Sequence, residues 1–215
     1  MRSKNGPSGQ DAETFIQQAR RRQFIECTVE SLVRLGFAGT TIAEVARRAG
    51  VSKSVVLYHF ASRAELLEAV MTQLYDDARP QVVAAMDAAP SHRDRVLAYV
   101  RTAVHFAWTH QRHATAALEI ARNLRRADGS PQYTARDNEE FITRAREELA
   151  AGQRAGEFGE FDTWTVAVLL RATIDALSEQ FTTNSELDGT QVAEHLVDLV
   201  DRIITPRTPK DRSKS

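Results

Sequence analysis

The sequence predicts an all-α protein of about nine helices, with an N-terminal three-helix helix-turn-helix domain and a C-terminal helical bundle. Apolar residues recur at three- and four-residue intervals along most of the chain, and no segment alternates in the way that predicts a strand. Ser, Thr or Asp precedes several periodic segments, and Gly follows others, as is typical of helix caps. With 42% hydrophobic and 27% charged residues, the chain should fold into buried cores.

Three helices are expected within the first sixty residues. Gly36 stands where a cap ends the first of them, over residues 13–35. Thr41 and the glutamate three residues later form a T-x-x-E capping box ahead of a short second helix, which ends at Gly50. Ser52 then caps a third short helix that runs to about residue 60.

The rest of the chain predicts six further helices. Ser62 caps the first of these, and Pro80 should kink or end it. The predicted ranges are 62–80, 93–110, 112–126, 136–152, 162–182 and 190–204. We therefore divide the chain into a disordered arm (1–12), a helix-turn-helix domain (13–62), a second helical domain (63–204) and a disordered tail (205–215), because both ends are rich in Gly, Ser, Pro and charge.

The charge is unevenly distributed, although the net charge is only −1. Residues 1–65 contain ten Lys and Arg against six Asp and Glu, whereas residues 66–205 contain fourteen against twenty-two. A basic N-terminal part ahead of an acidic body suits a chain whose beginning meets phosphates. No apolar stretch is long enough for a membrane span, and the start lacks the apolar core of a secretory signal, so we expect a cytoplasmic protein without a membrane partner.

The segment TIAEVARRAGVSKSVVLYHF at residues 41–60 fits a helix-turn-helix. Ala46 is small where two helices would cross, Gly50 provides the turn, and Val45 and Val56 have the spacing that packs one helix on the other. Several side chains of the second helix are left over for a DNA major groove. They are Lys53, Ser54, Val55, Leu57, Tyr58 and His59, while Thr41 and Ser52 stand at helix N-termini that favour phosphate.

This segment resembles the N-terminal domain of TetR-family repressors. The resemblance rests on GTT at 39–41, AGVSK at 49–53, YHF at 58–60 and SRAELL at 62–67, about fifty residues in all. It implies a regulator that binds double-stranded operator DNA, with Arg63 on the phosphate backbone and Arg21 and Arg22 near it. The first residue of the family's usual aromatic pair is Leu57 here, so Tyr58 or His59 would take over its phosphate contact.

The last two predicted helices carry two apolar stripes each, more than a single contact requires. One stripe can face the chain's own core and the other a second copy, so we expect a homodimer, as the resemblance also implies. Its two recognition helices would lie about 34 Å apart on a palindromic operator. The residues assigned to the dimer interface are Trp164, Val168, Ala172, Leu196 and Val200.

Polar and aromatic residues within the apolar helices of the body are candidates for a ligand pocket. The candidates are Tyr99, His105, Phe106, Trp108, His113, Asn123 and Phe141. They suggest an unknown small-molecule effector, hydrophobic or cationic, whose binding would release the repressor from its operator. The alternative is a DNA-binding activator or architectural protein that has no ligand.

An enzyme is not expected, and neither is a cofactor or a metal. Cys27 is the only cysteine, so no internal disulfide or multi-cysteine site can form. His105, His110 and His113 lack a carboxylate or thiolate that would complete a recognisable zinc site. The sequence has none of the paired E-x-x-H motifs of a di-iron bundle.

Overall fold

The computed structural model describes residues 9–134 and 139–206, and within these ranges it confirms the all-α class. The described residues form nine helices and no strand, apart from an isolated bridge between Arg125 and Pro131. The helices are α1 (Gly9–Gly39), α2 (Ile42–Ala49), α3 (Lys53–His59), α4 (Arg63–Asp87), α5 (His92–Thr109), α6 (Gln111–Asn123), α7 (Glu139–Arg154), α8 (Thr163–Thr183) and α9 (Gly189–Ile204).

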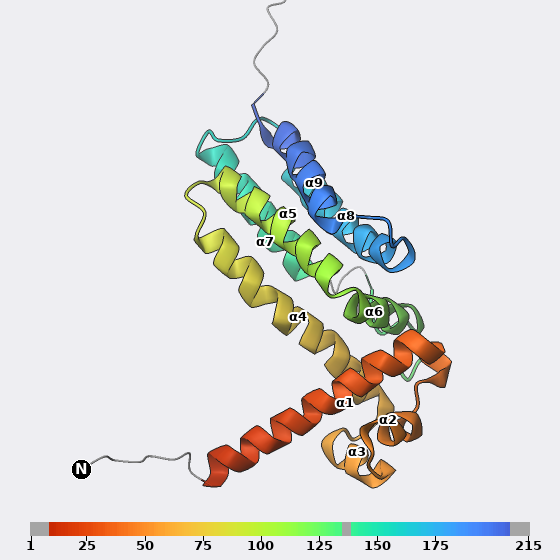
Figure 1. The fold of residues 1–215 in the computed structure, drawn as a ribbon. Helices are drawn as coiled ribbons and strands as arrows, with labels where there is room; N and C mark the ends of the chain where they lie inside the picture. Colours follow the sequence, from red (N-terminus) through yellow and green to blue (C-terminus); the bar gives the residue numbers. More distant parts are fainter. Residues whose placement is uncertain (1–8, 135–138, 207–215) are drawn as a thin grey trace, which may run out of the picture.

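The helices form two parts that α4 joins (Figure 1). Helices α1, α2 and α3 lie at one end, and α4 extends from them along the bundle of α5, α7, α8 and α9. Helix α6 lies between α1 and the bundle, so it contacts both parts. A change in the bundle can therefore reach the N-terminal helices through α4 and α6.

One hydrophobic core holds the N-terminal part together. Phe24, Val29 and Leu32 of α1 pack there with residues of α2 and α3, and all three are almost completely buried. The first turns of α4 and the apolar face of α6 belong to the same core. The expected boundary between residues 62 and 63 therefore passes through a shared core.

Helix α5 lies at the centre of the bundle. Its buried Val96, Val100 and Val104 contact apolar residues of α7, α8 and α9 in two further clusters. Ion pairs on the bundle surface join α5 to α9, with Arg93 on Asp201 at 2.6 Å and Arg101 on Glu194 at 2.6 Å. The arrangement leaves one side of α8 and α9 without a covering helix.

Some predicted helix ends differ from the observed ones. Helix α1 begins at Gly9, so residues 9–12 are helical where an arm was expected, and the rest of the arm, like tail residues 207–215, lies outside the described residues. Helix α4 continues through Pro80 to Asp87, so the expected end there was wrong. A proline removes only one helical hydrogen bond, and packing of the following turns on the bundle offsets this loss.

No helix among the described residues is both long enough and apolar enough to cross a membrane.

Candidate functional site

The turn between α2 and α3 has the geometry of a helix-turn-helix. The Thr41 side chain accepts a hydrogen bond from the Glu44 amide at 3.1 Å and so caps α2. Gly50 adopts a left-handed conformation (φ 68°, ψ 32°), which ends α2 and turns the chain. The Val51 amide then donates to the Ala46 carbonyl at 3.0 Å. These local bonds set the direction in which α3 leaves the turn.

The predicted capping box forms only in part. The Glu44 carboxylate does not return to the helix start but accepts two hydrogen bonds from Arg47, at 2.8 and 2.7 Å. It also pairs with Arg48 at 2.7 Å. The Arg47 bonds, helped by Arg48, lower the pKa of Glu44 to about 2. Ser52 makes no capping bond, and its hydroxyl lies 2.8 Å from that of Ser54.

Packing occupies one face of α3 and leaves the other free. Val45, Ala46 and Val56 are buried where α2 crosses α3, as the spacing predicted. Tyr58 is 76% exposed. Lys53, Ser54, Val55 and Leu57 are exposed as well. Their exposure agrees with the prediction that packing does not need them, and their contact with DNA stays a prediction.

His59 is less available than the sequence suggested. Its ring is half-buried, with its centroid 5.4 Å from that of Phe24, and its carbonyl accepts a hydrogen bond from Arg21. Burial, and then the positive charges of Arg21 and Arg20, lower the pKa of His59. The imidazole is therefore neutral at pH 7 and holds the end of α3 against α1.

Two of the arginines named by the resemblance also contact the protein. The Arg63 guanidinium lies 4.2 Å from the centre of the Phe37 ring and donates to the carbonyls of Phe37 and Thr40. Only its Nη1 has no bond to the described residues, so a phosphate contact from Arg63 stays a prediction for that nitrogen. Arg21 lies over the Phe60 ring at 4.1 Å, whereas Arg22 is exposed.

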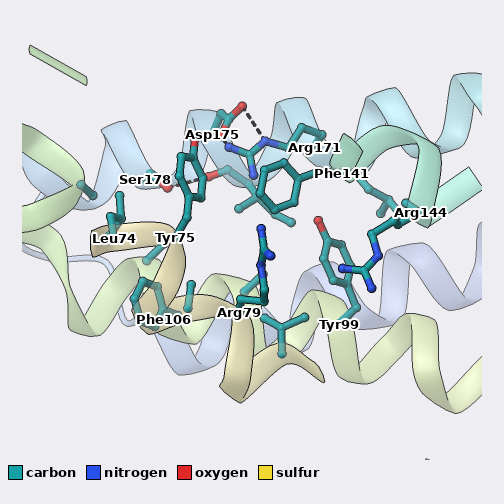
Figure 2. A pocket seen from close by; sticks show the side chains of 18 of the residues that line it. Leu74, Tyr75, Arg79, Tyr99, Phe106, Phe141, Arg144, Arg171, Asp175 and Ser178 are labelled. Atoms are coloured by element: carbon teal, nitrogen blue, oxygen red, sulfur yellow. Dashed lines mark hydrogen bonds and ion pairs between the residues drawn. The ribbon is translucent and has the colours of Figure 1, made fainter. Parts of the chain in front are cut away.

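A cavity of about 800 Å³ lies between α4, α5, α6, α7 and α8. Three of the predicted ligand residues line it, namely Tyr99, Phe106 and Phe141 (Figure 2). Its size is within the range of small-molecule sites. The cavity lies between the N-terminal core and the centre of the bundle, so a bound molecule would touch both α4 and α6.

The other four predicted ligand residues do not line this cavity. His105 is exposed, and Trp108 packs on Gly189 at the start of α9. His113 pairs with Glu26 of α1 at 2.9 Å, and Asn123 is exposed. Each lies on a face of its helix that turns away from α4 and α7. Among the described residues, no group of three His, Cys, Asp or Glu side chains could hold a metal ion.

The cavity also has charged residues that the sequence did not indicate. Arg79, Arg144 and Arg171 line it from α4, α7 and α8, and Asp175 joins them from α8. Arg171 donates two hydrogen bonds to Asp175, at 3.1 and 2.6 Å. Burial raises the pKa of Asp175, although Arg171 opposes the shift. In sequence these residues resemble the solvated charges of any helix, so periodicity gave no signal.

Polar contacts join α6 to α1. The Glu119 carboxylate accepts a hydrogen bond from the Phe37 amide at 3.3 Å, one residue after the break in α1 at Gly36. Arg112 pairs with Glu30, which also binds Arg48 of α2 at 3.8 Å. Together with the His113–Glu26 pair, these contacts connect the cavity wall to the helix-turn-helix.

Helices α8 and α9 carry an exposed apolar face. Trp164 is 55% exposed and Leu199 is 56% exposed, and Leu169 of α8 and Ile203 of α9 are exposed as well. Ala172 is exposed, and Val168 and Leu196 are half-buried. Val200 is only 2% exposed and packs in its own chain's core, so its assignment to the dimer interface was wrong. In α9 the outward stripe is the one that contains Leu199.

The N-terminal domain matches a known family in sequence. Residues 24–70 match the family model described as bacterial regulatory proteins, tetR family. The HTH-type transcriptional regulator BetI of Escherichia coli is 39% identical over 75 residues, which are 35% of this chain and 38% of BetI. The chain therefore matches well under half the length of this curated relative.

Solved structures match over nearly the whole chain. A tetR-family regulatory protein from Rhodococcus RHA1 has a TM-score of 0.74 at 20% identity, over 87% of this chain and 98% of that protein. The ketosteroid transcriptional regulator KstR2 of Mycobacterium tuberculosis has a TM-score of 0.71 at 19% identity, over 87% and 96%. The fatty acid degradation regulator FadR from Bacillus halodurans has 0.71 at 16%, over 92% and 96%. At these identities the likeness establishes the fold.

Proposed function

From the premise that residues 24–70 are a TetR-family DNA-binding domain, we propose that this protein is a transcriptional regulator that α3 anchors to operator DNA. The observation that carries the proposal is the free face of α3. Lys53, Ser54, Val55, Leu57 and Tyr58 are exposed on a helix whose buried side is fixed by Val56 and Phe60. A major groove about 12 Å wide admits such a helix.

Each exposed group of α3 suits a different part of a DNA groove. The Lys53 ammonium binds phosphate, and the Ser54 hydroxyl binds phosphate or a base edge. Val55 and Leu57 suit thymine methyl groups. Tyr58 replaces the aromatic phosphate contact that position 57 lacks, because its aromatic side chain is 76% exposed. His59 packs on Phe24 of α1 and so holds α3 against α1.

We infer a homodimer from the apolar face of α8 and α9. Trp164 and Leu169 of α8 and Leu199 and Ile203 of α9 expose large apolar side chains, and exposed apolar surface of this kind favours burial against a partner. A two-fold partner would bring two copies of α3 to a palindromic site, with half-sites about 34 Å apart.

The cavity is proposed as the effector site, and α6 as the link to DNA binding. A ligand that displaces α6 would pull on Glu119, Arg112 and His113, which hold α1. Movement of α1 would change the position of α3 and thus the fit of the dimer to its operator. Because such coupling is reciprocal, operator DNA would weaken ligand binding by the same factor.

Fluorescence anisotropy with the purified protein tests DNA binding. The probe is a duplex from the DNA upstream of the gene that contains an inverted repeat, and the competitor is random duplex DNA over a series of salt concentrations. We expect preference for the repeat and a steep salt dependence, whose slope falls by about 1 in Lys53→Ala. Tyr58→Ala should bind the repeat about tenfold more weakly.

A matched control is Arg154→Ala, which removes an exposed positive charge from α7, away from the DNA-binding helices. It should leave both the affinity and the slope unchanged. Equal affinity for the repeat and random DNA at every salt concentration would refute the proposal. Specific binding that no ligand of the cavity reverses would identify the ligand-independent activator or architectural protein instead.

A further inference from the structure

We propose that the effector of the cavity is an apolar molecule that carries one carboxylate or a similar anionic group. The inference rests on the proposed function, in which the cavity is the effector site, and it names the chemistry of the ligand. Three features carry it: apolar walls, two arginines without acceptors, and a tyrosine hydroxyl without a partner. It keeps the hydrophobic body that the sequence suggested and gives the ligand a negative instead of a positive charge.

The walls of the cavity are suited to an apolar body. Tyr75 and Phe141 lie with ring centroids 5.3 Å apart, and Phe106, Leu74 and Leu170 line the cavity beside them. Figure 2 shows the aromatic rings on either side of the space into which the charged groups point. Such walls favour a ligand whose bulk is hydrocarbon, because its burial removes apolar surface from water.

Two arginines bring positive charge into this apolar space. Arg79 of α4 and Arg144 of α7 point into the cavity, and neither has an ion pair or hydrogen bond among the described residues (Figure 2). Both remain accessible to solvent, as is expected at the mouth of a site. A guanidinium binds a carboxylate with two parallel hydrogen bonds, so these groups select an anion.

The acidic residues of the cavity are already compensated or solvated. Asp175 accepts two hydrogen bonds from Arg171. Glu148 pairs with His92 at 2.7 Å and with Arg95 at 3.8 Å. The remaining two, Asp87 and Glu147, are exposed. A cationic ligand would have to displace Arg171 from Asp175, whereas an anionic one finds Arg79 and Arg144 available.

Tyr99 supplies a third donor. Its side chain reaches the cavity from α5, and its hydroxyl points toward the space beside Phe141 (Figure 2). The hydroxyl has no hydrogen bond to any described residue. Burial raises the pKa of Tyr99, so the phenol stays protonated and donates its hydrogen. An anionic oxygen in the cavity would accept a hydrogen bond from this hydroxyl.

Calorimetric titration of the full-length, DNA-free protein with two matched series of probes tests the inference. One series is decanoate, decanol and decylammonium, and the other is naphthylacetate, naphthylethanol and naphthylethylammonium. Within each series the body is constant and the charge of the head changes. We expect a carboxylate to bind at least about tenfold more tightly than its alcohol, and its ammonium analogue to bind most weakly.

Three variants locate the effect. Arg79→Gln and Arg144→Gln should each weaken carboxylate binding about tenfold and leave binding of the alcohol unchanged. Tyr99→Phe should weaken carboxylate binding several-fold. Arg146→Gln is the matched control, because Arg146 is exposed on α7 and does not line the cavity. A thermal melt of each variant shows whether the fold is retained.

Preference for the alcohol or the ammonium probe would overturn the inference, as would failure of both carboxylates to bind. Loss of affinity in Arg146→Gln equal to that in Arg144→Gln would also overturn it. These readouts use no DNA, so they are independent of operator binding. Carboxylate binding through Arg79 and Arg144 in a protein that does not bind the operator would support the ligand chemistry and refute the proposed function.

Discussion

Leu199→Ala should weaken the dimer by about two orders of magnitude. Leu199 is 56% exposed. Burial of this exposed surface against a partner contributes about 2 kcal/mol to the dimer, at roughly 25 cal/mol per Å² of apolar surface. Truncation to alanine removes most of this, ~1.5 kcal/mol in each copy. Because both copies of a two-fold dimer carry the change, the total is ~3 kcal/mol and the dissociation constant rises about 100-fold. Sedimentation equilibrium measures this constant.

Val200→Ala is the matched control on the neighbouring position. Val200 is only 2% exposed and packs inside its own chain, so its truncation should cost about 1–3 kcal/mol of protomer stability. It should leave the dimer dissociation constant within about twofold. The reasoning is refuted if Leu199→Ala dimerises as tightly as the unchanged protein, or if Val200→Ala weakens the dimer more.

Three further perturbations test the remaining parts of the structure. Glu119→Gln weakens the bond to the Phe37 amide and should reduce ligand-induced release from DNA by about threefold, while direct titrations of ligand and of DNA stay unchanged. Gly36→Ala places a side chain at φ 67° and ψ −176° and should cost about 1–3 kcal/mol in urea unfolding. His59 has a lowered pKa, so the unfolded chain takes up its proton first as the pH falls below 6.5. The free energy of unfolding should therefore decrease below that pH, and it should decrease less steeply in His59→Phe. Equal decreases in the variant and the unchanged protein would contradict the lowered pKa of His59.

Local chemistry made the helix-turn-helix predictable. Thr41 caps α2, Gly50 turns the chain, and Val45 and Val56 are buried in the same core, all within residues 41–56 of the chain. Such contacts depend on spacing that the sequence displays directly. The exposed side chains of α3 were predicted as those that packing of α3 on α2 does not need, and the structure agrees except at His59. His59 is half-buried because it packs on Phe24, which lies in α1 far away in the sequence.

Long-range packing decided what the sequence could not. Both stripes of α9 are apolar, and only the position of α5 determines that Val200 is buried and Leu199 exposed. Arg79 and Arg144 resemble ordinary surface charges until α4 and α7 bring them to one cavity. The bonds from Arg63 to two carbonyls of its own chain could not be predicted, because those carbonyls lie more than twenty residues away in the sequence.

The most direct test of the account is a photo-crosslinking measurement at two positions of the full-length protein on operator duplex. Tyr58 is replaced by p-benzoylphenylalanine in one protein and Trp164 in another, since both side chains are exposed and their helices, α3 and α8, belong to different parts of the fold. We expect the probe at position 58 to crosslink to operator DNA and the probe at position 164 to crosslink to a second copy of the chain. A probe at position 58 that reacts with protein, or equally with random DNA, would contradict it.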